Sequence, residues 1–203
     1  MKLPLKEVKD LYYKRGLSAR KVGEILGSSV WQVIKFMKKN NLPRRNQAET
    51  HRLAFLVSPS SFKFKINLTN KEKELKIAGL MLYWGEGAKT TNKTVDLTNS
   101  DPLMIKLFLK MLREIYGVKE ERLKVLLYDY TNQDIKKLIN YWAGVTRISK
   151  KQFNKPYVRQ DFLEKKKGKM PYGLIHIRYH DKKLVTLIRS DIEKLIKKFI
   201  LPR

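Results

Sequence analysis

The chain has 203 residues, with 45 Lys and Arg against 19 Asp and Glu, which gives a formal net charge of +26 at pH 7. This charge favours a polyanionic partner, because binding releases the cations condensed on a phosphate backbone. At 42% hydrophobic residues the chain can bury real cores, which excludes a disordered basic tail. A membrane partner is not expected, since the longest uncharged apolar run, Ile77 to Trp84, is far shorter than the roughly 20 residues of a span.

The chain contains no cysteine, which excludes disulfides, thiolate zinc sites and a cysteine nucleophile. Its three histidines, His51, His176 and His180, are too few and too scattered to predict a zinc site. Lysines interrupt the N-terminus before any apolar region, so no signal peptide is expected. We therefore expect a cytoplasmic, nucleoid-associated protein of a prokaryote, and the high charged fraction favours a thermophile.

The first 45 residues have the pattern of three short helices joined by tight turns. The spacing of apolar residues predicts a first helix over 5–14, and Gly16 ends it as the residue after the cap. Ser18 is the expected N-cap of a second helix, Gly27 forms the following turn, and Ser29 caps a third helix.

This layout resembles the helix-turn-helix of resolvase-type DNA-binding domains. The resemblance is carried by Val22-Gly23-Glu24, Leu26-Gly27, Ser29 to Val33 and the trailing Leu42-Pro43-Arg44-Arg45. It implies a third helix that lies in the major groove of double-stranded DNA, with its first turn against base edges. The alternative is a three-helix fold that contacts other proteins.

Two sets of residues follow from this resemblance. The candidate base-contacting residues are Val30, Trp31, Gln32 and Lys35. Among them Gln32 is expected to read adenine, while Trp31 could equally pack against its own domain. The residues expected to hold phosphates are Lys38, Lys39, Arg44 and Arg45.

Residues 46–68 are expected to form a connector, and residues 69–203 a larger α+β domain. Thr69 and Glu72 predict a capping box before an apolar helix that ends near residue 87. Strands are predicted near Lys89 and over 94–99, 123–130 and 174–179. Helices are predicted after Asp101-Pro102, over 133–141, and from Asp181 to about Ile200. The Lys-rich stretch 149–171 is expected to be a loop that follows phosphates.

This order resembles the LAGLIDADG homing-endonuclease fold, an αββαββα domain with a saddle-shaped antiparallel sheet. The segment Leu80-Met81-Leu82-Tyr83-Trp84-Gly85-Glu86-Gly87 is similar to a variant of the signature helix. Asn99-Ser100-Asp101-Pro102 with Met104-Ile105 also matches that family. The departures are Met81, where glycine is commoner, the helix after residue 132, and the Lys-rich stretch.

The resemblance implies a homodimer in which two signature helices pack together and place two acids below a DNA-binding saddle. By position the catalytic and metal-binding acid is Glu86, with Mg²⁺ as the cofactor if the protein cleaves DNA. The residues expected at the dimer interface are Ala78, Gly79, Leu82 and Gly85. The residues expected on the polar faces of the strands are Lys89, Asp96, Thr98, Lys124, His176 and Arg178.

Two functions remain open at this point. The protein is a divalent-metal-dependent DNA endonuclease, or a DNA-binding regulator or DNA-organising protein that uses the same fold without cutting. RNA is a less suitable partner, because a helix-turn-helix fits the wide major groove of B-form DNA. No glycine loop for phosphates and no nucleophile–base pair stands out, so no small-molecule substrate is expected.

Overall fold

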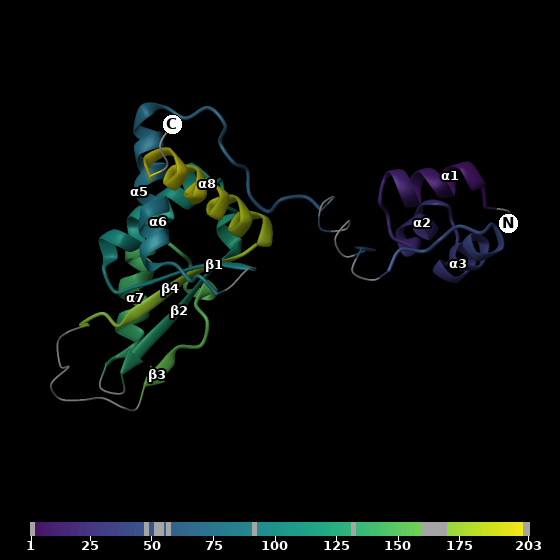
Figure 1. Cartoon of the computed structure of the whole chain (residues 1–203). Helices are drawn as coiled ribbons and strands as arrows, with labels where there is room; N and C mark the ends of the chain where they lie inside the picture. The colour runs from purple at the N-terminus through teal and green to yellow at the C-terminus, as the bar shows by residue number, and fades with distance from the viewer. Residues whose placement is uncertain are drawn as a thin grey trace. The chain divides into compact units, whose positions relative to one another are not determined.

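The computed structural model describes residues 3–46, 49–50, 55, 58–90, 93–130, 133–159 and 170–200. The chain divides into two compact units, Met1–Pro59 and Ser60–Arg203, each with its own hydrophobic core (Figure 1). None of the helices in the described residues is long and apolar enough to cross a membrane. Part of the expected connector belongs to the second unit, because Phe62, Phe64 and Leu68 pack against its core.

The first unit has the three helices that the sequence predicts. Helix α1 (Leu5–Lys9) continues into a π-helical segment (Asp10–Lys14), and α2 (Ala19–Ile25) and α3 (Val30–Lys39) follow. The predicted N-caps are confirmed, since Ser18 Oγ accepts from the Lys21 amide and Ser29 Oγ from the Gln32 amide, both at 3.2 Å. The core residues of this unit are Leu3, Val8, Leu11, Tyr12, Val22, Val33 and Met37.

Two glycines make the tight turn between α2 and α3 possible. Gly27 has a φ of 64°, a left-handed conformation that glycine adopts without steric cost. At Gly23 a Cβ atom would lie 2.5 Å from the Ser28 carbonyl oxygen, so a side chain there would push the turn away from α2. The close approach of α2 to the turn therefore depends on the absence of a side chain at this position.

The second unit is a mixed α and β domain, as expected. Its elements in chain order are α5 (Asn70–Glu86), β1 (Thr94–Asn99), α6 (Pro102–Glu114), β2 (Leu123–Tyr130), α7 (Ile135–Thr146), β3 (Tyr157–Arg159), β4 (Leu174–His180) and α8 (Lys182–Ile200). The predicted capping box of Thr69 and Glu72 opens α5, and Asp101 caps α6 with Pro102 in its first turn. Asp181 accepts from the first amides of α8, those of Lys183 and Leu184.

The four strands form one sheet in the order β1-β4-β2-β3. β4 is antiparallel to both β1 and β2, whereas β3 runs parallel to β2. The expectation of a purely antiparallel sheet is therefore wrong at its β3 edge. The strand predicted near Lys89 is also wrong, because the described residues 87–90 form no strand and contribute the isolated bridge between Gly87 and Leu97.

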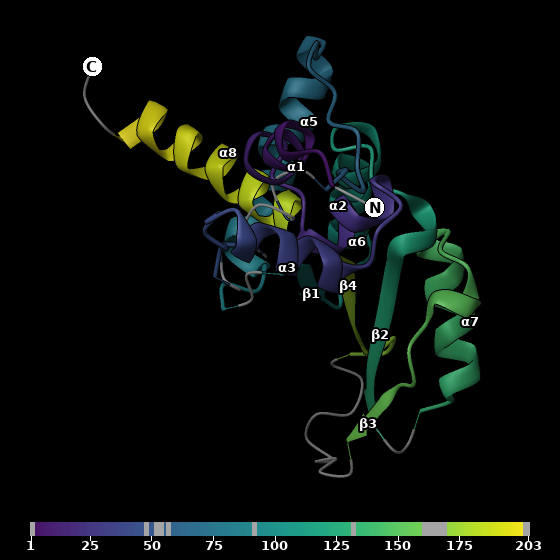
Figure 2. The same cartoon turned by 90° about the vertical axis from the view of Figure 1, so that its right-hand side faces the viewer.

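Alternation along the strands divides the sheet into two faces. One face carries the apolar residues Val95, Leu97, Leu123, Val125, Leu127, Ile175, Ile177 and Tyr179, which share one core with α5, α6, α7 and α8. In Figure 1, α5, α6 and α8 lie together on one side of the strands, and Figure 2 shows α7 beside β2. The opposite face, called the open face below, carries mostly polar side chains, because strand residues alternate between the two sides.

Two other parts of the second unit differ from the sequence prediction. α7 runs on to Thr146, beyond the predicted end at residue 141, because Trp142 and Val145 continue its buried stripe. The Lys-rich stretch 149–171 was predicted to be a loop, but it contains a 3-10 turn (Lys150–Gln152) and strand β3. Residues 160–169 of that stretch lie outside the described part of the chain.

Candidate nucleic-acid interface

The exposed side of α3 presents several of the predicted DNA-contacting residues together. Val30 is exposed, and Trp31 is 77% exposed, so the tryptophan does not pack into the core of its own unit. Lys35, Lys38 and Lys39 are exposed on the same helix. This side of α3 therefore offers a flat apolar ring and several positive charges to a partner.

Gln32, predicted to read adenine, also has a structural role in this protein. Its side-chain oxygen Oε1 accepts from the Ser29 amide at 2.9 Å, which completes a capping box at the start of α3. Reading adenine with both ends of the amide needs that oxygen as an acceptor for the base. Gln32 therefore takes part in helix capping, while its amide nitrogen and the second lone pair of Oε1 have no hydrogen-bond partner among the described residues.

Arg45 also differs from its predicted role. Its guanidinium lies over the Tyr12 ring at 4.0 Å and donates to the Leu17 carbonyl, and its amide donates to the Tyr12 hydroxyl at 3.1 Å. These contacts hold the segment after α3 against the core of the first unit. Arg44 is exposed, and its contact with phosphate stays a prediction.

On the open face of the sheet, the strand register brings together five of the six residues predicted there. Across neighbouring strands, Asp96 lies opposite Arg178, and Arg178 lies opposite Lys124. Thr98 lies opposite His176 on the same face. Arg178 Nε donates to Asp96 Oδ2 at 2.7 Å, and His176 Nδ1 lies 2.9 Å from Asp96 Oδ1. Thr98 Oγ1 lies 2.8 Å from the same ring nitrogen. One carboxylate therefore orients two of the side chains that would meet a ligand.

The ionisation of Asp96 reflects these contacts. Burial by itself raises the pKa of this carboxyl group, because the charged form loses solvation. Hydrogen bonds and charge from His176 and Arg178 outweigh burial, and the pKa of Asp96 lies below its ordinary value. Asp96 is thus a fixed negative charge that holds Arg178 in place on the open face.

An aromatic row continues across the open face toward β3. The ring centroids of His176 and Tyr128 are 4.8 Å apart, and those of Tyr128 and Tyr157 are 5.0 Å apart. Tyr157 is more than half exposed. Tyr128 and Tyr157 were not among the residues predicted from the sequence, although Tyr128 lies four residues after Lys124 in the same strand and therefore on the same face.

Beside this row, a concavity of about 310 Å³ opens between β1, β4 and the chain after Gln152. It is lined by Thr94, Asp96, Lys124, Asn154, Arg178 and His180. His180 Nδ1 lies 2.7 Å from Thr94 Oγ1, whereas His176 contacts Asp96 and Thr98. The two histidines thus have separate partners, and no group of three His, Asp or Glu side chains gathers into a metal site within the described residues.

The C-terminal half of α5 carries the remaining predicted residues. Ala78, Gly85 and Glu86 are exposed, Leu82 is half-buried, and a Cβ at Gly85 would meet open space. Gly79 is buried instead, and a Cβ there would lie 2.8 Å from Met111 Cβ on α6. The close helix approach that Gly79 predicts therefore occurs within one chain, which removes Gly79 from the expected dimer interface.

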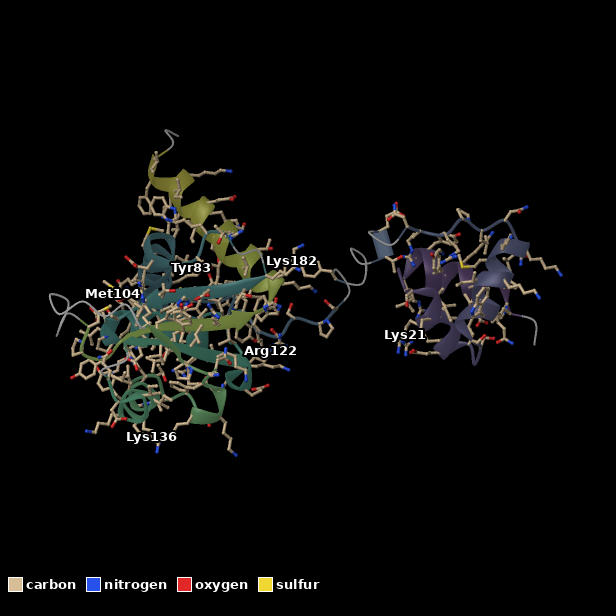
Figure 3. All side chains as sticks on the ribbon, turned by 90° about the horizontal axis from the view of Figure 1, so that it is seen from below. Lys21, Tyr83, Met104, Arg122, Lys136 and Lys182 are labelled. Atoms are coloured by element: carbon tan, nitrogen blue, oxygen red, sulfur yellow. The ribbon has the colours of Figure 1, made fainter. Side chains whose placement is uncertain are left out.

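Lys89 lies apart from the open face. It follows the end of α5, its carbonyl accepts from Arg189 Nη2 at 3.0 Å, and its side chain lines a cavity between α5 and α8. Other basic residues, such as Lys21, Arg122, Lys136 and Lys182, are exposed on both units (Figure 3). Positive charge alone therefore does not identify one surface as the candidate nucleic-acid interface. The candidate surfaces are identified instead by the arrangement of side chains on α3 and on the open face.

Comparison of the chain with protein-family models, with curated proteins and with solved structures finds no match.

Proposed function

We propose that the protein is a site-recognising, double-stranded DNA-binding protein in which α3 of the first unit is the reading helix. The observation that carries the proposal is the exposed side of α3, where Trp31 and Lys35 stand in the first turns and Lys38 and Lys39 near the end. Side chains from the first turns of such a helix reach base edges, while lysines farther along hold phosphates. The net charge of +26 favours the same polyanionic partner.

The open face of the second unit is the second DNA-contacting surface in this proposal. Arg178 and Lys124 supply positive charge there, and Tyr157 and Tyr128 supply flat apolar area. Asp96 holds Arg178 in one orientation, which suits a defined contact better than a mobile side chain does. This arrangement agrees with the resemblance to the LAGLIDADG fold, in which the sheet forms the DNA-binding saddle.

The test is binding to labelled duplex DNA as a function of salt, measured by fluorescence anisotropy. With about six phosphate contacts the plot of log affinity against log salt should have a slope near −5 or steeper. Single-stranded DNA and double-stranded RNA of the same length serve as controls and should bind more weakly. A flat salt dependence, or stronger binding to RNA, would reject the proposal.

A second candidate function is DNA cleavage by a homodimer, and the position of Glu86 favours it. This carboxylate is exposed at the end of α5, next to Gly85, whose surroundings are open. Within the described residues one chain offers a single acid at this place, which does not fit a Mg²⁺ site. A second copy packed through Ala78, Leu82 and Gly85 would bring its own Glu86 to the same point, so cleavage requires dimerisation.

Incubation of supercoiled plasmid with Mg²⁺ or Mn²⁺ tests this second function. If the protein cuts, Glu86→Gln should abolish cutting and leave DNA affinity unchanged or higher, because the substitution removes a negative charge but keeps the shape. Glu74→Gln, an exposed position on the same helix, is the matched control and should cut normally. Cutting that survives Glu86→Gln places the reaction elsewhere, and no cutting of any duplex favours a regulator or DNA-organising protein.

A further inference from the structure

The open face combines a positive concavity with a row of aromatic rings farther along the same strands. On β2 the side chains that alternate onto this face are Lys124, Leu126 and Tyr128. Lys124 lines the concavity of about 310 Å³, whereas Tyr128 stands in the aromatic row. Four residues of an extended strand span about 13 Å, so the two features are separated by that distance. A ligand that meets both of them is therefore extended.

Lys124 supplies a positive charge to the concavity that no neighbour balances. Its side chain is exposed and has no hydrogen bond or ion pair with any other described residue. Asp96, the acid in the lining, is paired with Arg178 at 2.7 Å, so its charge is compensated within the sheet. Asn154 adds a side-chain amide to the same lining. A free ammonium beside an oriented guanidinium suits a phosphate group, whose oxygens accept from both.

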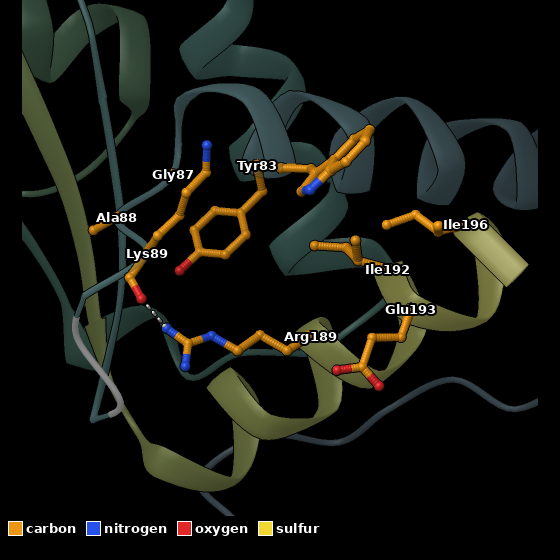
Figure 4. Close-up of a pocket in the computed structure, with 9 residues that line it drawn as sticks. Tyr83, Gly87, Ala88, Lys89, Arg189, Ile192, Glu193 and Ile196 are labelled. Atoms are coloured by element: carbon orange, nitrogen blue, oxygen red, sulfur yellow. Dashed lines mark hydrogen bonds between the residues drawn. The ribbon is translucent and has the colours of Figure 1, made fainter. Parts of the chain in front are cut away.

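The cavity between α5 and α8 does not have this excess of charge. Arg189 and Glu193, one turn apart on α8, both line it, so opposite charges stand in one wall. The Lys89 side chain extends away from the Arg189 guanidinium (Figure 4). Of these two hollows, charge therefore favours the one on the open face as a phosphate site.

Tyr157 presents an aromatic ring that its own unit leaves uncovered. It is 57% exposed and lies in β3, the edge strand beside β2 (Figure 2). Its ring centroid is 5.0 Å from that of Tyr128, which in turn lies against His176. In an intact duplex the faces of the bases are covered by their neighbours, and a protein reaches only the base edges. An unpaired base exposes its face and stacks on such a ring.

We propose that the open face binds an unpaired stretch of one DNA strand, with a phosphate group in the concavity and a base stacked on Tyr157. Binding of this kind rests on the proposed function, in which α3 of the first unit holds the adjoining duplex. The second unit then contributes a flat ring that an intact duplex leaves without a matching surface. The favoured target is duplex DNA that contains a few unpaired nucleotides.

The probe is a labelled duplex with a gap of about five unpaired thymidines in one strand, enough to cover the distance along β2. Anisotropy with the full chain should show at least about fivefold tighter binding to this gapped duplex than to an intact duplex of equal length, the effect of one stacked base. A gap of equal length built from abasic sugars keeps the phosphates and the flexibility but has no bases, so it should lose the preference.

Equal affinity for the gapped and intact duplexes would overturn the inference and leave duplex binding by α3 in place. A preference that persists with the abasic gap would also overturn it, because flexibility alone would then explain the result. The salt dependence of binding to the intact duplex tests the proposed function separately.

Variants assign the base to Tyr157. Tyr157→Ala should bring the ratio of the two affinities close to one, whereas Tyr157→Phe should keep the preference, because stacking needs the ring and not the hydroxyl. The matched control is Tyr172→Ala, since this exposed tyrosine stacks on Tyr141 of α7 and not on the open face. It should keep the preference. A preference that survives Tyr157→Ala would overturn the assignment.

A lysine pair tests the phosphate site. Lys124→Met should reduce the slope of log affinity against log salt for the gapped duplex by about one, as expected for the loss of one phosphate contact. Lys106→Met, at an exposed position on α6, is the control and should leave the slope unchanged. An unchanged slope in Lys124→Met would overturn the placement of a phosphate in the concavity.

Discussion

Asp96 is the central charged residue of the open face, because its carboxylate contacts both His176 and Arg178. A nearly buried carboxylate is tolerated only where hydrogen bonds and opposite charge replace its lost solvation. The lowered pKa of Asp96 records that balance. The ionised form consequently stabilises the folded state and positions the side chains next to it.

Asp96→Asn should reduce the free energy of unfolding by about 1–3 kcal/mol at pH 7. The stabilisation by the ionised carboxylate is complete above the ordinary carboxyl pKa of about 4 and is lost as the pH falls through the lowered pKa of the folded protein. The stability difference between the two proteins should therefore shrink below pH 4. Urea unfolding between pH 2.5 and 7 measures this, with Glu121→Gln at an exposed position as the control. A difference that grows toward acid would contradict the argument.

Two neighbouring residues of α3 should behave differently when each is replaced. Trp31→Ala should reduce discrimination between a selected duplex and a scrambled one, because this exposed ring is free to contact bases. Gln32→Ala should mainly cost helix stability, about 0.5–1 kcal/mol, since the Ser29 amide loses its acceptor. Anisotropy with both duplexes, together with thermal melting, separates the two effects. Loss of discrimination in Gln32→Ala with unchanged melting would restore Gln32 as a base reader.

At the scale of elements, two sides of α5 differ in what surrounds their glycines. Gly79 faces α6 and allows Met111 to pack against the helix backbone. Ala78, Leu82 and Gly85 form a separate stripe, of which Ala78 and Gly85 are exposed. One side of the helix thus joins the core of its own unit, and the stripe with Ala78 and Gly85 is the surface through which we propose that a second copy packs.

Matched glycine substitutions distinguish these two sides of α5. Gly79→Leu should lower stability by about 1–3 kcal/mol, because the side chain overlaps Met111 in a filled core. Gly85→Leu should leave the melting temperature unchanged or higher, since glycine is a poor helix former and the site is open. Light scattering should show weaker self-association for Gly85→Leu. If both unmodified protein and Gly85→Leu are monomers, with and without DNA, the dimer proposal is wrong.

At the scale of the whole molecule, two separate cores predict two independently stable units. The cores share no residue, one lying within the first 59 residues and the other within residues 60–203. A chain with two linked binding surfaces gains affinity, because the second contact becomes intramolecular. The linkage would let a small reading unit act together with a larger DNA-contacting unit.

Fragments 1–59 and 60–203 should each show a cooperative thermal transition by circular dichroism. Their separate affinities for one duplex should be weaker than that of the full chain by about 10²-fold or more, as expected for tethered binding. The control is an equimolar mixture of the fragments, which should not regain the affinity of the full chain. A fragment 60–203 that binds as tightly as the full chain would show that the first unit adds nothing to binding.

Local features of this protein were determined by the sequence itself. Ser18, Ser29, Thr69 and Asp101 cap their helices as predicted, because a cap bonds to amides within three residues along the chain. The spans of β1 and β2 were likewise predicted from alternation over a few residues.

Only the tertiary structure decided which surfaces these elements share. The parallel pairing of β3, the contact of Gly79 with Met111, and the cavity that joins Tyr83 to Arg189 all connect residues far apart in the chain. The position of Gln32 at the start of α3 was compatible with base contact and with helix capping. In the structure its side-chain oxygen accepts from the Ser29 amide. Such choices depend on packing and on competition between partners, which periodicity and spacing do not record.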